Sequence, residues 1–376
     1  MPELTRLSNG NYVLSWQEPL SGGGYRFAMA IGKPGKWSDV RTIASSPNLS
    51  MFTADLPGIA ELPGGALMAY WEMKDLREGD RYDTVIATAV SHDAGKTWFS
   101  SKQPYGDVLS GQHSFLSWFP AQDGVGLIWL DAQQRSLMRH TSIGQDRMGS
   151  VGLRYAHLNP AGETTHESFI DPIACECCPT SASLTSRGPV VVYRGRQEDV
   201  GTKPWEVRGD RATIRDIYIM RFQGGMWSEP HLVHQDNWLI NACPDNGPAV
   251  DADGSNAAVA WWTRSENTPK ALVAFSEDSG DTFGPAIRLD QGKAEGQVTV
   301  ALLPGGKAAV VGWLEDSHAW ARYVSSSGIM GPSVVLGISP RHSRLPRWLA
   351  DGKGVTAAWT SEVEGHRQVQ VSRLNF

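Results

Sequence analysis

The stretch Ser91-His92-Asp93-Ala94-Gly95-Lys96-Thr97-Trp98 decides the fold, because its pattern returns as Ser276-Glu277-Asp278-Ser279-Gly280-Asp281-Thr282-Phe283. Both copies read Ser-x-Asp-x-Gly-x-Thr-aromatic and stand after a strand-like segment. In such a turn the Asp accepts backbone N–H groups, the Gly takes a positive φ, and the aromatic ring packs back onto the strands. A tight hairpin explains every shared residue type, which an acidic ligand site does not. The shared structural residues are Ser91, Asp93, Gly95, Thr97 and Trp98, and Ser276, Asp278, Gly280, Thr282 and Phe283.

A longer repeat runs through the whole chain. In each unit a Gly-containing turn precedes a short β-rich strand, and an aromatic residue stands near the end of that strand. The seven aromatic residues are Trp16, Trp71, Trp129, Tyr193, Trp261, Trp313 and Trp359. A third strand follows, as at 25–31, 84–90, 216–222 and 271–275, and usually a fourth. One such sheet cannot bury both faces alone, and radial packing against its neighbours solves that problem.

The repeat therefore predicts an all-β fold, a β-propeller of about seven four-stranded blades in a single domain over residues 1–376. Six blades with an irregular pair is the alternative. The last unit stops after its third strand, at 367–374, so we expect a strand from the N-terminal end to complete that blade and protect its edge.

The two Asp-containing turns resemble the Asp boxes of the bacterial neuraminidase repeat (BNR repeat), which is found in sialidases and related propellers. The resemblance implies a sialidase-like β-propeller. Sialidases hold the carboxylate of their substrate with three arginines, the first in an Arg-Ile-Pro motif, and the matching segment here, 51–57, reads Met-Phe-Thr-Ala-Asp-Leu-Pro. A guanidinium fork binds a carboxylate at two points, and neither Ala nor Asp replaces it. Sialidase activity would need arginines recruited from other positions.

Arginines gather in the long loop of the fourth unit. Arg194, Arg196 and Arg215 alternate there with acidic residues such as Asp216. They predict a possible anion-binding pocket. The alternative is a salt-bridged surface loop, which the mixed charges favour.

Four cysteines form the second unusual feature: Cys175, Cys177, Cys178 and Cys243. Counted back from the following turn, Cys178 and Cys243 occupy equivalent positions at the start of an inner strand. The same count places His113 and His342 at that level, on the face where propellers bind ligands. Thiolate and imidazole donors select soft or borderline metals, chiefly copper, with zinc as the alternative. A disulfide that links Cys175 or Cys178 to Cys243, and free thiols, remain alternatives.

Composition limits the partners. The 376 residues carry a net charge of −6 and scattered basic residues, which argues against nucleic acid. No run of 18 apolar residues is present, so no transmembrane segment is expected. The expected partner is a metal ion or a small anionic or glycan ligand.

Three functions follow from the sequence. The first is an exported propeller, periplasmic or secreted after removal of a signal peptide, with a Cys/His site for a soft metal such as copper. The second is an exo-sialidase-like glycoside hydrolase with rearranged arginines. The third is a non-catalytic interaction scaffold whose blades are linked by disulfides.

Overall fold

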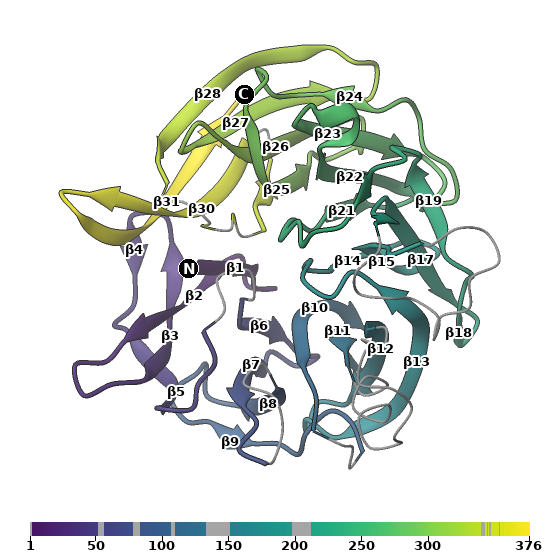
Figure 1. Cartoon of the computed structure of the whole chain (residues 1–376). Coiled ribbons are helices and arrows are strands. Elements are labelled where there is room, and N and C mark those ends of the chain that lie inside the picture. Colours follow the sequence, from purple (N-terminus) through teal and green to yellow (C-terminus); the bar gives the residue numbers. More distant parts are fainter. Residues whose placement is uncertain are drawn as a thin grey trace.

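A computed structural model describes most of the chain (Figure 1). The described residues are 2–51, 56–77, 83–106, 110–132, 151–197, 212–339, 343, 345, 347–352 and 354–376. His342 and residues 52–55 of the segment that lacks the sialidase arginine lie outside them. Figure 1 shows the strands arranged as a ring of sheets, with the first strand of each sheet nearest the centre.

The ring consists of seven antiparallel blades. Blade 1 holds β1 (Pro2–Arg6), β2 (Tyr12–Pro19), β3 (Tyr25–Lys33), β4 (Lys36–Trp37) and β5 (Arg41–Ser46). Blade 2 holds β6 (Gly58–Glu61), β7 (Leu67–Lys74), β8 (Thr84–Ser91) and β9 (Phe99–Ser100). Blade 3 holds β10 (His113–Ala121), β11 (Gly124–Asp131), β12 (Val151–Leu158) and β13 (Thr164–Ala174). Blade 4 holds β14 (Ser181–Thr185), β15 (Gly188–Arg194), β17 (Ile217–Gln223), β18 (Met226–Trp227) and β19 (His231–His234), beside a ribbon of β16 (Thr213–Ile214) and β20 (Leu239–Ile240). Blade 5 holds β21 (Ala249–Asp253), β22 (Asn256–Thr263), β23 (Lys270–Ser276) and β24 (Ile287–Arg288). Blade 6 holds β25 (Ala294–Leu302), β26 (Ala308–Glu315), β27 (His318–Ser325) and β28 (Met330–Ile338). Blade 7 holds β29 (Leu349–Asp351), β30 (Gly354–Val363) and β31 (His366–Asn375). The predicted propeller of about seven blades is confirmed.

The aromatic residue that closes the second strand of each repeat anchors the core. Trp129, Tyr193, Trp261 and Trp313 are all almost fully buried. Their rings fill the space between blades, where both faces of each sheet are covered. A buried indole N–H needs an acceptor, and Trp313 donates to Glu315 over 2.8 Å. The spacing of these aromatic residues is the part of the sequence that sets the repeat.

Closure of the ring differs from the expectation. The N-terminal strand β1 pairs with β2 in blade 1, so the prediction that it completes the last blade is wrong. Blade 7 has three strands among the described residues. Blades 1 and 7 meet through side chains instead: Leu4 and Tyr12 pack against Ala358, and Thr356 Oγ1 donates a hydrogen bond to the Tyr12 hydroxyl over 3.2 Å. Apolar packing therefore closes the ring.

The two Asp-containing turns share one hydrogen-bond pattern. In the second, Asp278 accepts bonds from the Thr282 backbone N–H at 2.9 Å and from the Thr282 hydroxyl at 2.6 Å, and the Ser276 Oγ accepts the Gly280 N–H at 2.9 Å. Asp93 makes the equivalent bonds in the first turn. Burial raises the pKa of Asp278, but the bonds from Thr282 outweigh it and lower the pKa to about 2. The carboxylate therefore stays charged and holds its own turn.

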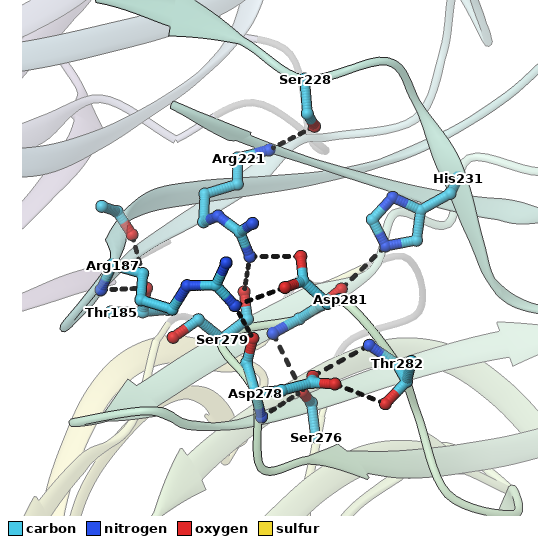
Figure 2. A network of polar contacts seen from close by, with 12 residues as sticks. Thr185, Arg187, Arg221, Ser228, His231, Ser276, Asp278, Ser279, Asp281 and Thr282 are labelled. Atoms are coloured by element: carbon cyan, nitrogen blue, oxygen red, sulfur yellow. Dashed lines mark hydrogen bonds and ion pairs between the residues drawn. The ribbon is translucent and has the colours of Figure 1, made fainter. Parts of the chain in front are cut away.

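The second turn also docks onto the preceding blade, as Figure 2 shows. Arg187 and Arg221 reach across from blade 4, and both pair with Asp281. Arg221 also donates to the Ser279 carbonyl over 3.2 Å, and Nε2 of His231 donates to the Gly280 carbonyl over 2.8 Å. Every one of these partners is part of the fold, which gives the turn a structural role.

Replacing Gly280 with alanine is expected to destabilise the protein by about 3 kcal/mol. The φ of Gly280 is +87°, and a Cβ there would lie 2.7 Å from Cδ1 of Ile219. Gly284→Ala is the matched control, because the nearest atom to its Cβ is the Phe275 carbonyl oxygen at 3.7 Å. Urea unfolding measures both variants. Equal midpoints for the two would contradict this account of the turn.

Candidate functional site

The cysteines lie in two connections that enter neighbouring inner strands. Cys175, Cys177 and Cys178 follow β13 and precede β14, and Cys243 lies between β20 and β21. Figure 1 shows β14 and β21 side by side near the centre of the ring. Residues 66 apart in the sequence therefore meet at one end of the propeller.

The four cysteines form one group, here called the cysteine cluster. Cys177 and Cys243 are joined by a disulfide, while Cys175 and Cys178 are free thiols. The Cys175 Sγ lies 3.2 Å from the Cys178 Sγ and 3.7 Å from the Cys177 Sγ. Cys175 and Cys178 are buried, and Cys243 is exposed. The disulfide alternative named Cys175 or Cys178 as the partner of Cys243, and the structure has Cys177 in that place.

A backbone turn brings the three sequential sulfurs together. The Cys175 N–H donates to the Arg194 carbonyl over 2.8 Å, which ties this connection to β15. The Cys178 N–H then donates back to the Cys175 carbonyl over 3.4 Å. In an extended strand successive side chains point to opposite faces, so this turn is what lets all three sulfurs converge.

Arg215 and Arg196 supply positive charge beside the cluster. Arg215 Nη1 donates to the Cys175 Sγ over 2.9 Å and lies 3.6 Å from a Glu176 carboxylate oxygen. Arg196 donates to the other Glu176 oxygen over 2.9 Å. Both arginine side chains are at most 3% exposed. Buried charges need partners, and here the partners are Glu176 and a sulfur.

Arg194 adjoins the cluster, because its carbonyl accepts the Cys175 N–H, and its side chain binds backbone. Its guanidinium donates to the carbonyl oxygens of Asn246 at 2.9 Å and Trp262 at 2.6 Å, and also to that of Arg215. It also stacks on the Trp238 ring, 5.1 Å from the centroid. The three arginines of the predicted anion pocket do gather, but each holds a group of the protein itself.

The two free thiols differ in acidity. Burial raises the pKa of Cys175, but its hydrogen bond with Cys178 and the charge of Arg215 outweigh that effect and bring the pKa to about 7. Burial also raises the pKa of Cys178, and the neighbouring Cys175 raises it further. Cys175 is therefore the residue that carries negative charge near neutral pH, with Cys178 as its hydrogen-bond donor.

One of the two predicted histidines, His113, has partners other than the cysteines. His113 is buried at the start of β10, where its Nδ1 lies 3.1 Å from Asp131 Oδ2 and its ring stacks on Tyr105. Within the described ranges, the groups of side chains able to hold a metal ion contain cysteines and Asp245, and neither contains His113. The role of His342 stays a prediction, because the residue lies outside the described part of the chain.

Sequence reasoning missed Asp245 as a member of the site and missed the contact between Arg215 and Cys175. Asp245 joins Cys177 and Cys243 in a donor group whose ligand atoms lie within 4.8 Å of one another. Its signal was an acid two residues after Cys243. Arg215, 40 residues from Cys175, was predicted to bind an anion and contacts the thiol.

No known family model matches the chain, and no curated protein matches it. Among solved structures it is similar to an ulvan lyase, a polysaccharide lyase, with a TM-score of 0.58 and 10% identity over 98% of this chain and 91% of that one. A puromycin hydrolase mutant matches with a TM-score of 0.55 and 12% identity over 100% of this chain and 52% of that one. A Trypanosoma rangeli sialidase matches with a TM-score of 0.47 and 12% identity over 98% of this chain and 58% of that one.

These similarities define a class of fold. The chain is a seven-bladed β-propeller, as its own strand pairing shows and as the ulvan lyase match supports. At such low identities the similarities show the fold alone, and function has to be argued from the site. Within the described residues, no helix is long and apolar enough to cross a membrane.

Proposed function

We propose that this chain is an exported propeller that binds a soft metal ion, copper as Cu(I), through the cysteine cluster. Zinc is the alternative metal. The observation that carries the proposal is the convergence of Cys175, Cys177 and Cys178, whose sulfur atoms all lie within 4.8 Å of one another. Metal–thiolate bonds of about 2.3 Å place neighbouring sulfurs of a tetrahedral site roughly 3.8 Å apart. Cys177 is held in the disulfide, so the thiolate donors are Cys175 and Cys178, whose sulfurs lie 3.2 Å apart and would separate by about 0.6 Å to reach that geometry.

The surroundings suit bound thiolates. Arg215 contacts Cys175, and the charge of Arg194 acts favourably on the ionised form of Cys178. Two cations therefore offset the negative charge that the thiolates bring into a buried site. Soft sulfur donors favour Cu(I) over hard cations such as calcium or magnesium.

The disulfide bears on both the compartment and the choice of metal. Disulfides persist in oxidising compartments, so the Cys177–Cys243 bond supports an exported location. With that bond formed, the cluster offers two thiolates, Cys175 and Cys178. Structural zinc sites take four ligands, so the disulfide form favours Cu(I) over zinc.

We expect the purified protein to bind one equivalent of Cu(I) in an anaerobic titration against a chromophoric chelator. Changes to residues that merely support metal ligands weaken binding by about 10- to 100-fold, so loss of a ligand in Cys178→Ser should weaken it by about 100-fold or more. Cys243→Ser is the opposite comparison, because it frees the Cys177 thiol beside the buried pair and should therefore bind Cu(I) at least as tightly as the wild type. The proposal fails if Cys178→Ser binds Cu(I) as tightly as the wild type while circular dichroism shows both folded.

A further inference from the structure

The disulfide and the buried thiols of the cysteine cluster are close enough to react with each other. The Cys175 Sγ lies 3.7 Å from the Cys177 Sγ, one of the two disulfide sulfurs, and 3.2 Å from the Cys178 Sγ. A thiolate breaks a disulfide by attacking one of its sulfurs. Cys175 is therefore placed between the bond it would attack and the thiol that would resolve the product.

Exposure distinguishes the two ends of the disulfide. Cys243 is exposed, while Cys177 is only 7% exposed and the free thiols are buried. A sulfur released at Cys243 meets water and can take up a proton there. Attack on Cys177 by Cys175 thus has a leaving group that solvent stabilises.

We propose that the cysteine cluster is a thiol–disulfide exchange centre, which moves its disulfide from Cys177–Cys243 to Cys175–Cys178. In the first step the Cys175 thiolate attacks the Cys177 Sγ. The Cys175–Cys177 bond forms, the Cys177–Cys243 bond breaks, and its electron pair leaves on Cys243, which is protonated by water.

In the second step Cys178 gives up its proton and attacks the Cys175 Sγ. The Cys175–Cys178 bond forms, the Cys175–Cys177 bond breaks, and Cys177 leaves as a thiolate that takes up the proton lost by Cys178. One disulfide and two thiols are present before and after, so no outside oxidant or reductant is needed. The exchange unlinks the connections before β14 and β21 and turns Cys243 into an exposed thiol beside Asp245.

This exchange does not depend on metal binding, and its test uses no metal. The metal-free protein is incubated at neutral pH with excess iodoacetamide and without reductant, and peptide mass spectrometry follows alkylation of Cys243. The tryptic peptide that carries Cys243, residues 222–264, contains no other cysteine, so the label is assigned without ambiguity.

In the wild type we expect Cys243 to become alkylated over hours, while Cys175 and Cys178 become linked to each other. Cys175→Ser removes the attacking thiol and should slow this labelling at least about tenfold, a difference of roughly 1.4 kcal/mol in the barrier. Cys178→Ser is the matched comparison, because the first step alone releases Cys243 and labelling should persist.

Two results would overturn the exchange. One is labelling of Cys243 in Cys175→Ser at the wild-type rate. The other is a wild-type protein that carries no label on Cys243 after a day. This second result is read from the wild type alone, so it does not depend on whether any variant folds. Neither result depends on whether the protein binds Cu(I) in the separate titration, because the exchange is measured on the metal-free protein.

Discussion

Replacing Arg194 with methionine is expected to destabilise the protein by about 4 kcal/mol, since each buried carbonyl left without a donor costs about 1–3 kcal/mol. The Arg194 side chain holds the carbonyl oxygens of Asn246, Arg215 and Trp262, which come from three separate segments. Methionine keeps much of the volume and supplies no donor. Urea unfolding followed by tryptophan fluorescence measures the loss.

The matched control is Arg264→Met. Arg264 is exposed and donates no side-chain hydrogen bond within the described part of the chain, so its loss should change stability by at most about 0.5 kcal/mol. If Arg194→Met were as stable as this control, Arg194 would be available for a ligand, and the anion pocket predicted from the sequence would return as the better interpretation.

The second large effect is expected for Cys243→Ser. The disulfide closes a loop with a sequence separation of 66 residues, and the chain-entropy relation gives a loss of about 4 kcal/mol when such a loop opens. The variant should unfold at a lower urea concentration than the wild type. The loss lies within the total stability of an ordinary domain, about 5–15 kcal/mol, so a folded variant is expected.

Reduction gives an internal control for this variant. Dithiothreitol should destabilise the wild type by the same amount and should change Cys243→Ser much less, because its long loop is already open. Equal stability of the wild type and Cys243→Ser without reductant would show that the disulfide does not tie the two connections together in solution.

The fold could be predicted from the sequence because each repeat is defined by residues that lie close together in the chain. A glycine in a tight turn and an aromatic residue at the end of the next strand, as at Gly254 and Trp261, identify one blade without reference to any other. Ring closure was not readable in this way. It depends on how Tyr12 and Ala358 meet across almost the whole chain, and no local pattern reports that contact.

The candidate site was readable in part for the same reason. Counting back from each turn placed the cysteines at the starts of neighbouring inner strands, because blades repeat the same spacing. Which sulfur joins Cys243 depends on the short turn at Cys175–Cys178, whose shape is set by a bond to Arg194. The partners of Arg215 likewise depend on two blade segments meeting, so the sequence showed its charge and not its contact with Cys175.

X-ray absorption at the copper edge of the Cu(I)-loaded protein tests whether the cysteines bind the metal. We expect sulfur atoms at about 2.3 Å from the copper, and we expect this sulfur coordination to be lost in Cys175→Ser and Cys178→Ser. A first shell of nitrogen and oxygen alone, or no copper retained by the folded wild type, would contradict binding by the cysteines.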